Sequence, residues 1–146
     1  MGVTLKAAGK EFRQLNREVR AAYDAGAREV IVEEVNGQYF TGAGLQGPLR
    51  LVVHGVPGND TACYLDGPEV IIHGNAQDGV GNTMNRGRVV VHGRAGDVLG
   101  YGMRGGEILV RDSVGYRVGI HMKEYGRQVP LILIGTNAGA FLGEYM

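Results

Sequence analysis

The sequence predicts an all-β protein: a right-handed parallel β-helix of about six coils, 19 residues each, with an N-terminal amphipathic capping helix. Three observations predict this fold. Gly accounts for 26 of the 146 residues and Pro for only 4, which favours many tight corners over disorder. Short apolar runs of β-branched residues lie between the glycines. One pattern recurs every 19 residues, and this period suits coils that stack about 4.8 Å apart.

The first 28 residues lack the repeat and are expected to form the cap. Apolar side chains between Lys10 and Ala25 fall on one helical face, and Gly26 is well placed as a C-cap. These side chains are Phe12, Leu15, Val19, Ala22 and Tyr23. An open β-helix end exposes strand edges and core side chains, so a cap is expected there. Residues 1–28 are therefore assigned to a capping helix and residues 29–146 to the glycine-repeat domain.

The repeat is clearest at His54, His73 and His92, which lie 19 residues apart, each between an apolar run and a glycine. In the same register, two columns of small or glycine residues mark the corners of the coils. The first column is Gly58, Gln77, Gly96 and Gly115, and the second is Ala62, Gly81, Gly100 and Gly119. Sharp corners often require a positive φ, which explains why glycine recurs there.

Two apolar columns are expected to form ladders inside the coils. The first contains Leu65, Met84, Met103 and Met122 and extends to Leu45 and, past a longer insertion at residues 125–128, to Met146. The second contains Thr61, Val80, Leu99, Val118 and Leu142. The chain stops partway through a coil at Met146 without a second cap. We expect either that the chain is truncated or that another molecule covers that end.

The strands themselves predict an interaction surface. Both alternating sets of side chains are apolar in the runs 51–53, 70–72, 89–91 and 108–110. One face of this wall must therefore be covered from outside, and the N-terminal helix can cover only part of it. This surface is the functional feature that the residues favour most.

Composition excludes several classes of partner. The 15 Lys and Arg balance the 15 Asp and Glu, so neither nucleic acid nor an anionic membrane surface is an expected partner. Cys63 is the single cysteine, which excludes a disulfide framework, and the N-terminus lacks a signal-peptide pattern. The apolar stretch 129–134 is far shorter than the roughly 20 residues of a membrane-spanning helix. A cytoplasmic location is expected.

Two segments, Gly42–Gly47 and Gly100–Gly105, match the dinucleotide-binding pattern G-x-G-x-x-G. That pattern binds pyrophosphate only when a helix N-terminus follows it, and strand-like sequence follows both copies here. The glycines are therefore interpreted as coil corners.

Other polar columns invite chemical roles that their neighbours do not support. Zinc binding by His54, His73 and His92 lacks a carboxylate or cysteine in the column, whose next member is Arg111, so a half-buried polar ladder is favoured and its role stays open. The column Asn59, Asp78 and Asp97 is expected to cap turns. Cys63 has no base in register. No catalytic, cofactor-binding or metal-binding residue is assigned.

The repeat units HGNAQDGVGNTMNRG, HGRAGDVLGYGMRGGEI and RDSVGYRVGIHMKEY resemble the glycine-repeat (GXGXG) domain at the C-terminus of the glutamate synthase large subunit, in its stand-alone form. The domain is also similar to one of the subunits of formylmethanofuran dehydrogenase. The resemblance covers roughly residues 29–146, and its pattern G-D-x-x-G-x-x-M-x-G-G stands at 96–106. It implies a right-handed β-helix.

The resemblance also implies a function. This chain would be a non-catalytic scaffold subunit of a split glutamate-synthase-like complex, an oxidoreductase, that organises a glutamine amidotransferase and a flavin synthase. FMN and an iron–sulfur cluster are expected on the partner chains and not on this one, which has no Cys cluster and has Gly2 where a nucleophilic cysteine would stand.

Three alternatives stay open. The chain could instead be a subunit of a formylmethanofuran-dehydrogenase-like complex. It could be an independent β-helix enzyme, which predicts paired acidic residues in register on one face, and the columns contain none. It could also be a self-assembling protein that pairs through the uncapped C-terminal coil.

Overall fold

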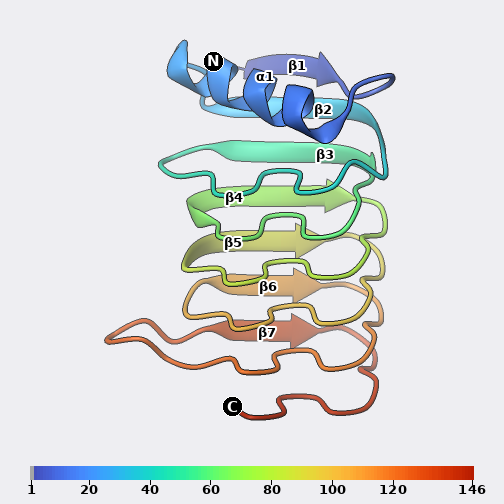
Figure 1. The fold of residues 1–146 in the computed structure, drawn as a ribbon, viewed down its shortest axis with the longest axis vertical. Helices are drawn as coiled ribbons and strands as arrows, with labels where there is room; N and C mark the ends of the chain where they lie inside the picture. The colour runs from blue at the N-terminus through green and yellow to red at the C-terminus, as the bar shows by residue number, and fades with distance from the viewer. Residues whose placement is uncertain (1) are drawn as a thin grey trace.

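The computed structural model describes residues 2–146 and confirms the predicted fold class. Seven strands form one parallel sheet in chain order, so each turn of the chain adds the next strand (Figure 1). The elements are β1 (Gly2–Lys6), α1 (Phe12–Asp24), β2 (Glu29–Asn36), β3 (Arg50–Val56), β4 (Asp66–His73), β5 (Arg86–Val91), β6 (Glu107–Val110) and β7 (Leu131–Ile134).

The predicted 19-residue register is the pairing register of the sheet. Leu51 pairs with Val70, Val70 with Val89, and Val89 with Ile108, so like positions stack from β3 to β6. The offset grows to 24 between β6 and β7, where Ile108 pairs with Ile132. The extra residues include a small hairpin closed by Tyr125 and Gln128, at the predicted insertion. Five complete turns join β2 to β7, fewer than the predicted six, because residues 135–146 form only part of a turn.

The core runs along the inside of the coils as one continuous cluster. Leu45, Leu65, Met84 and Met103 are buried, and Met122 packs against them, which confirms the first predicted ladder. The second ladder is buried from Thr61 to Val118. The last members of both ladders are exceptions. Leu142 is 62% exposed and Met146 is 68% exposed, because the last coil has a neighbour on one side only.

The N-terminal segment contains a strand that the sequence interpretation missed. β1 pairs with β2 in parallel and extends the sheet, so residues 1–28 are not simply a capping helix. Helix α1 confirms the amphipathic prediction: Leu15 and Val19 are buried in the core cluster, and Gly26 follows the helix with a φ of 108°. The domain boundary at residue 28 stays a prediction.

Helix α1 takes the place that the return loops occupy in the other turns. It lies in front of β1 and β2 (Figure 1), and its buried residues share a cluster with the inward side chains Val30 and Val32. The helix therefore packs on the inner side of the sheet. The expectation that it covers part of the outer apolar wall is wrong. Within residues 2–146 no helix has the length and apolar content needed to cross a membrane.

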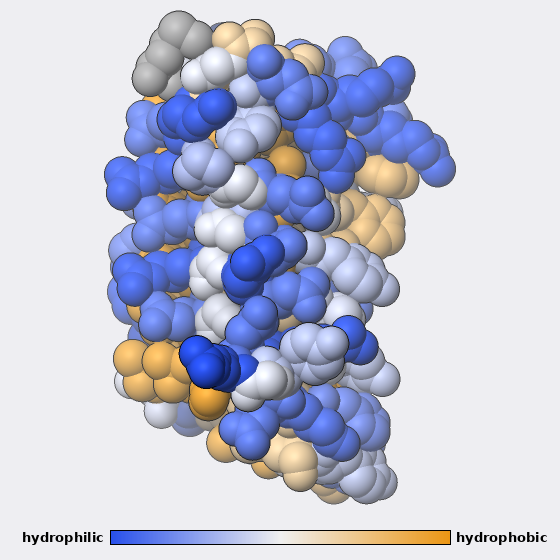
Figure 2. Space-filling view, turned by 90° about the vertical axis from the view of Figure 1, so that its left-hand side faces the viewer, coloured by the Kyte–Doolittle hydropathy of each residue, from blue (hydrophilic) through white to orange (hydrophobic). Residues whose placement is uncertain are grey.

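Hydrophobic surface gathers at the C-terminal end of the solenoid, near the bottom of Figure 2. Its exposed apolar side chains are Val129, Leu131, Leu133, Phe141, Leu142, Tyr145 and Met146. All of them except Val129 belong to β7 and the partial turn after it, which have no further coil beside them.

Candidate interaction surface

The glycine-rich loops form a second wall opposite the sheet, built from alternating left-handed residues. In each turn, three alternate residues have a positive φ, for example Gly79, Gly81 and Thr83. The equivalent triplets are Phe40, Gly42 and Gly44; Asp60, Ala62 and Tyr64; Val98, Gly100 and Gly102; Arg117, Gly119 and His121; and Phe141, Gly143 and Tyr145. The column of Ala62, Gly81, Gly100 and Gly119 thus has the positive φ that the sequence analysis expected.

This alternation directs the backbone N–H groups of each loop to both neighbouring coils. Gly79 and Thr83 donate to carbonyls of the following coil, at 2.9 Å and 2.7 Å. Gly81, between them, donates to the Thr61 carbonyl of the preceding coil at 2.9 Å. The same pattern repeats from turn to turn, so buried backbone donors are satisfied without a second β-sheet. The loop wall is therefore a hydrogen-bonded stack and not a set of independent turns.

The corner glycines Gly58, Gly96 and Gly115 are required for a different reason than the predicted one. They do not have a positive φ. A Cβ atom at Gly96 would collide with Asp78 Oδ1, and one at Gly115 would collide with Asp97 Oδ1. Glycine is therefore needed at these two positions because a carboxylate of the preceding coil occupies the space.

The column Asn59, Asp78 and Asp97 has a structural role across coils. Asn59 Oδ1 accepts from the Asp78 N–H at 3.1 Å, and Asp78 Oδ1 accepts from the Asp97 N–H at 2.7 Å. Asp97 Oδ1 in turn accepts from the Tyr116 N–H at 2.8 Å. These side chains hold backbone turns as predicted, but each holds the turn of the next coil.

The two G-x-G-x-x-G segments lie in these loops. Gly42, Gly44, Gly100 and Gly102 all occupy left-handed positions of the loop wall, and strands β3 and β6 follow. Within the described residues no helix begins after either segment. The structure therefore supports the interpretation as coil corners.

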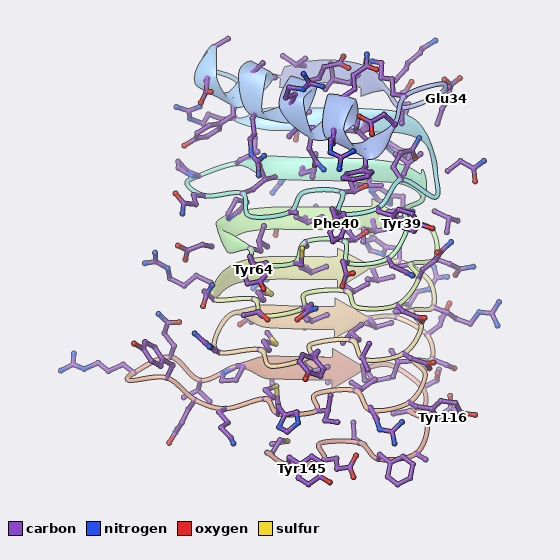
Figure 3. All side chains as sticks on the ribbon, in the orientation of Figure 1. Glu34, Tyr39, Phe40, Tyr64, Tyr116 and Tyr145 are labelled. Atoms are coloured by element: carbon purple, nitrogen blue, oxygen red, sulfur yellow. The ribbon has the colours of Figure 1, made fainter. Side chains whose placement is uncertain are left out.

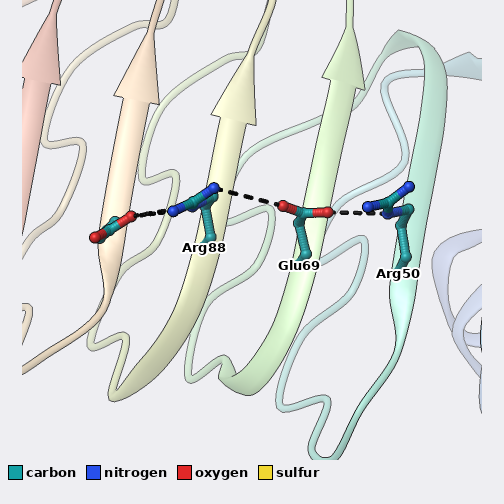
Figure 4. Close-up of polar contacts among 4 residues, drawn as sticks. Arg50, Glu69 and Arg88 are labelled. Atoms are coloured by element: carbon teal, nitrogen blue, oxygen red, sulfur yellow. Dashed lines mark hydrogen bonds and ion pairs between the residues drawn. The ribbon is translucent and has the colours of Figure 1, made fainter.

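The outer face of the sheet carries three parallel ladders, of which the first is ionic (Figure 4). Arg50 Nε lies 2.9 Å from Glu69 Oε1, and Arg88 Nη2 lies 2.9 Å from Glu107 Oε2. Longer contacts of 3.9 Å join Arg50 to Glu29 and Arg88 to Glu69. The charges alternate from β2 to β6, so each guanidinium lies between two carboxylates. Exposed pairs contribute little singly, but a network has more effect.

The second ladder is apolar and runs along the middle of the outer face. Val52, Ile71, Val90 and Leu109 are in register, and all are half-buried. The ladder ends at Leu133 on β7, which is 60% exposed. The ionic ladder flanks it on one side and the histidines on the other. The predicted apolar wall therefore exists as a narrow stripe, and no other element within residues 2–146 lies over it.

The third ladder is the histidine column, whose rings stack face to face on the surface. The ring centroids of His54 and His73 are 4.9 Å apart, and those of His73 and His92 are 5.0 Å apart. Desolvation, and then repulsion from His54 and His92, hold the pKa of His73 below its ordinary value. In the described part of the chain, no three His, Cys, Asp or Glu side chains are grouped to hold a metal ion.

Cys63 is buried in the loop wall. Burial, together with the charge of Asp60, raises the pKa of its thiol to about 11, so the thiol stays protonated and unreactive at neutral pH. This agrees with the prediction that no base activates it.

Aromatic side chains gather on the loop wall instead of the sheet. Tyr39, Tyr64, Tyr101, Tyr116 and Tyr145 are exposed by 40–65%. Figure 3 shows Tyr39, Phe40 and Tyr64 projecting from successive loops below α1. Tyrosine is enriched at protein interfaces, so the loop wall is a second candidate contact surface.

The sequence interpretation missed the ionic ladder. Its signal was present, because positions 50, 69, 88 and 107 read Arg, Glu, Arg and Glu in the 19-residue register. Alternating charge at the repeat period predicts ion pairs between stacked coils. The aromatic loop wall had no such signal, since its tyrosines occupy different columns.

Comparisons with known proteins agree with this architecture. A family model described as "GXGXG motif" matches residues 13–146. An uncharacterized protein of Methanocaldococcus jannaschii, MJ1350, is 50% identical over 147 residues, which cover 99% of this chain and 56% of the relative. The chain thus spans about half the length of that relative. No solved structure is a significant match. The chain belongs to the GXGXG motif family, the glycine-repeat domain family found at the C-terminus of glutamate synthase.

Proposed function

We propose that this chain is a non-catalytic scaffold subunit of a split glutamate-synthase-like complex. In this proposal it organises a glutamine amidotransferase and a flavin, iron–sulfur synthase, which are separate chains and carry the FMN and the cluster. The outer sheet face is the main contact surface for these partners. Family membership suggests the association, and the observation that carries the scaffold role is the ordered outer face with its uncovered apolar stripe.

The physical basis is the stiffness and the regularity of this face. Each strand from β2 to β6 is fixed by pairs on both sides, so the stripe and its flanking ladders form a regular surface with little freedom. A preorganised surface binds a partner with a small entropic cost. Val52, Ile71 and Val90 supply apolar contact, while the ionic and histidine ladders would form the polar rim that interfaces usually have.

The test is affinity purification of the native protein from its source cells, followed by mass spectrometry of the chains that remain bound. The proposal predicts recovery of a glutamine amidotransferase and a flavin synthase, with flavin and iron–sulfur absorbance in the same fraction. Recovery of formylmethanofuran dehydrogenase subunits would replace the proposal with that alternative. Recovery of the chain alone would contradict both.

Two matched variants locate the contact surface. Val90→Glu places a charge in the apolar stripe, and Tyr101→Glu places the same charge on the loop wall of the same turn. The proposal predicts that Val90→Glu loses the partners, because burying an unpaired charge is costly, and that Tyr101→Glu retains them. The reverse result would assign the contact to the loop wall.

A further inference from the structure

A cleft between α1 and the first loop contains an unusual concentration of arginine. Its volume is ≈ 560 Å³, and its lining includes Phe12, Arg13, Asn16, Arg17, Arg20 and Phe40. No carboxylate is among the residues that line it. We refer to these six residues as the arginine cleft.

The positive charge of the arginine cleft is uncompensated. Arg17 has no ion-pair partner within residues 2–146, and Arg13 has only the exposed Glu11 at 3.8 Å. Residues 1–28 contain six Lys and Arg against three Asp and Glu, a formal charge of +3 in a chain whose total is zero. The region therefore attracts acidic groups although the protein as a whole does not.

The arrangement is also unfavourable for the helix itself. Arg13 and Arg17 are four residues apart, and Arg17 and Arg20 are three apart, so like charges are neighbours on one helical face. Arg13 stands in the first turn, where the helix macrodipole favours a negative charge, and that turn has no acidic residue. An anionic occupant would relieve both effects.

Aromatic rings form one side of the arginine cleft. The ring centroids of Phe12 and Phe40 are 5.4 Å apart, and Tyr39 lies edge-on to Phe12 at 6.5 Å. The Arg13 guanidinium lies 4.8 Å above the Phe12 ring. Tyr39 remains 52% exposed and Phe40 39% exposed. Arginine and aromatic residues together are the typical composition of binding hot spots.

Hydrogen bonds hold the arginine cleft in shape. Asn16 Nδ2 donates to the Phe40 carbonyl at 2.9 Å, and Asn16 Oδ1 accepts from the Gly42 N–H at 3.0 Å. Arg20 donates to the Ala43 carbonyl at 2.6 Å. The helix and the loop are therefore fixed relative to each other, and a ligand meets a preorganised surface.

We propose that the arginine cleft binds an acidic segment of a partner protein that carries an aromatic or aliphatic anchor. The carboxylates of the segment pair with Arg13 and Arg17, and its anchor packs on Phe12 and Phe40. This inference rests on the proposed function for the existence of a partner, and it adds a second contact surface, separate from the outer sheet face.

Fluorescence anisotropy with the full chain tests the proposal directly. The probe is a fluorescein-labelled peptide of Asp, Glu and Phe, and its neutral counterpart has Asn and Gln in place of the acids. The acidic peptide is expected to bind at least about tenfold more tightly than the neutral one, with an affinity that falls as salt rises. Inorganic polyphosphate serves as a second competitor without an apolar anchor.

Matched variants separate this site from general charge attraction. Arg13→Glu with Arg17→Glu is expected to weaken acidic-peptide binding by at least about tenfold. Arg104→Glu with Arg127→Glu makes the same charge change at exposed arginines without ion-pair partners in the described chain, and should leave binding nearly unchanged. Phe40→Asn removes the ring at a left-handed position that Asn tolerates, and should also weaken binding. Circular dichroism checks that each variant is folded.

Several results would overturn this inference. These are equal binding of the acidic and neutral peptides, equal loss in both arginine pairs, or tighter binding of polyphosphate that persists in Phe40→Asn. Peptide binding needs no native partner, so its failure is distinct from a failure to recover partner chains from cells. Partners retained by Arg13→Glu with Arg17→Glu in the native purification would also contradict the site while leaving the scaffold proposal intact.

Discussion

At the scale of single residues, the stack of coils imposes a left-handed backbone on residues that rarely adopt it. Val98 has a φ of 51° and Thr83 a φ of 55°, although both are β-branched. The glycine columns made a positive φ predictable at Gly81 and Gly100. Nothing at Val98 or Thr83 announced it, because their conformation follows from the hydrogen bonds of the neighbouring coils and not from their own preference.

Val98 provides a test of this conformation. Val98→Gly should be more stable to urea than Val98→Ala by about 1 kcal/mol, because only glycine avoids the cost of the left-handed region. At Val90, in strand β5, the order should reverse, since glycine in a strand is about 0.5–1 kcal/mol less stable than alanine. The same order at both positions would show that Val98 is not strained.

Asp97 tests the hydrogen bonds between coils. Asp97→Ala should lower the free energy of unfolding by about 1 kcal/mol, because the Tyr116 N–H loses its acceptor. Asp97→Asn keeps an oxygen at the same place and should lose much less. Equal losses in the two variants, measured by urea denaturation, would assign the effect to something other than this bond.

His73 tests the electrostatics of the histidine stack. An NMR titration should give a pKa below the ordinary 6.5, and replacing His54 and His92 by Gln should raise it. A depressed histidine pKa means that the unfolded chain binds protons more readily, so this contribution to stability is present above pH 6.5 and is lost as the pH falls below it. An unchanged pKa in the double variant would contradict the effect of stacking.

At the scale of elements, the outer sheet face combines features that the sequence partly predicted. The apolar runs predicted two apolar faces for each strand, and β3 to β6 have them. The exposure of the outer set was not predictable, because it depends on the long side chains of the ionic ladder and on the histidine rings beside it. The strand β1 was missed because its five residues precede the repeat and have no counterpart 19 residues later.

Arg88 tests the ionic ladder. Arg88→Glu places three carboxylates on neighbouring strands, between Glu69 and Glu107, and should lower the free energy of unfolding by about 1 kcal/mol at low ionic strength. High salt should reduce the loss, because these charges are exposed. Arg104→Glu, at an exposed arginine outside the ladder, is the control and should have little effect. A loss that does not depend on salt would contradict an electrostatic origin.

At the scale of the whole molecule, the two walls differ in what they can contact. The sheet wall carries a rigid apolar stripe between two polar ladders, and the loop wall carries exposed tyrosines on a stack of backbone hydrogen bonds. The arginine cleft stands where α1 meets the loop wall. The 19-residue period made the solenoid predictable, but the contact surfaces depend on which side chains the coils bring together.

The most direct test of the scaffold account is the rate of glutamate formation from glutamine and 2-oxoglutarate by the partner chains, measured with and without this chain. The account predicts no activity from this chain alone, a low rate from the partners alone, and a clear increase when the three are combined. Partner chains that reach the full rate without this chain, or activity in this chain by itself, would contradict it.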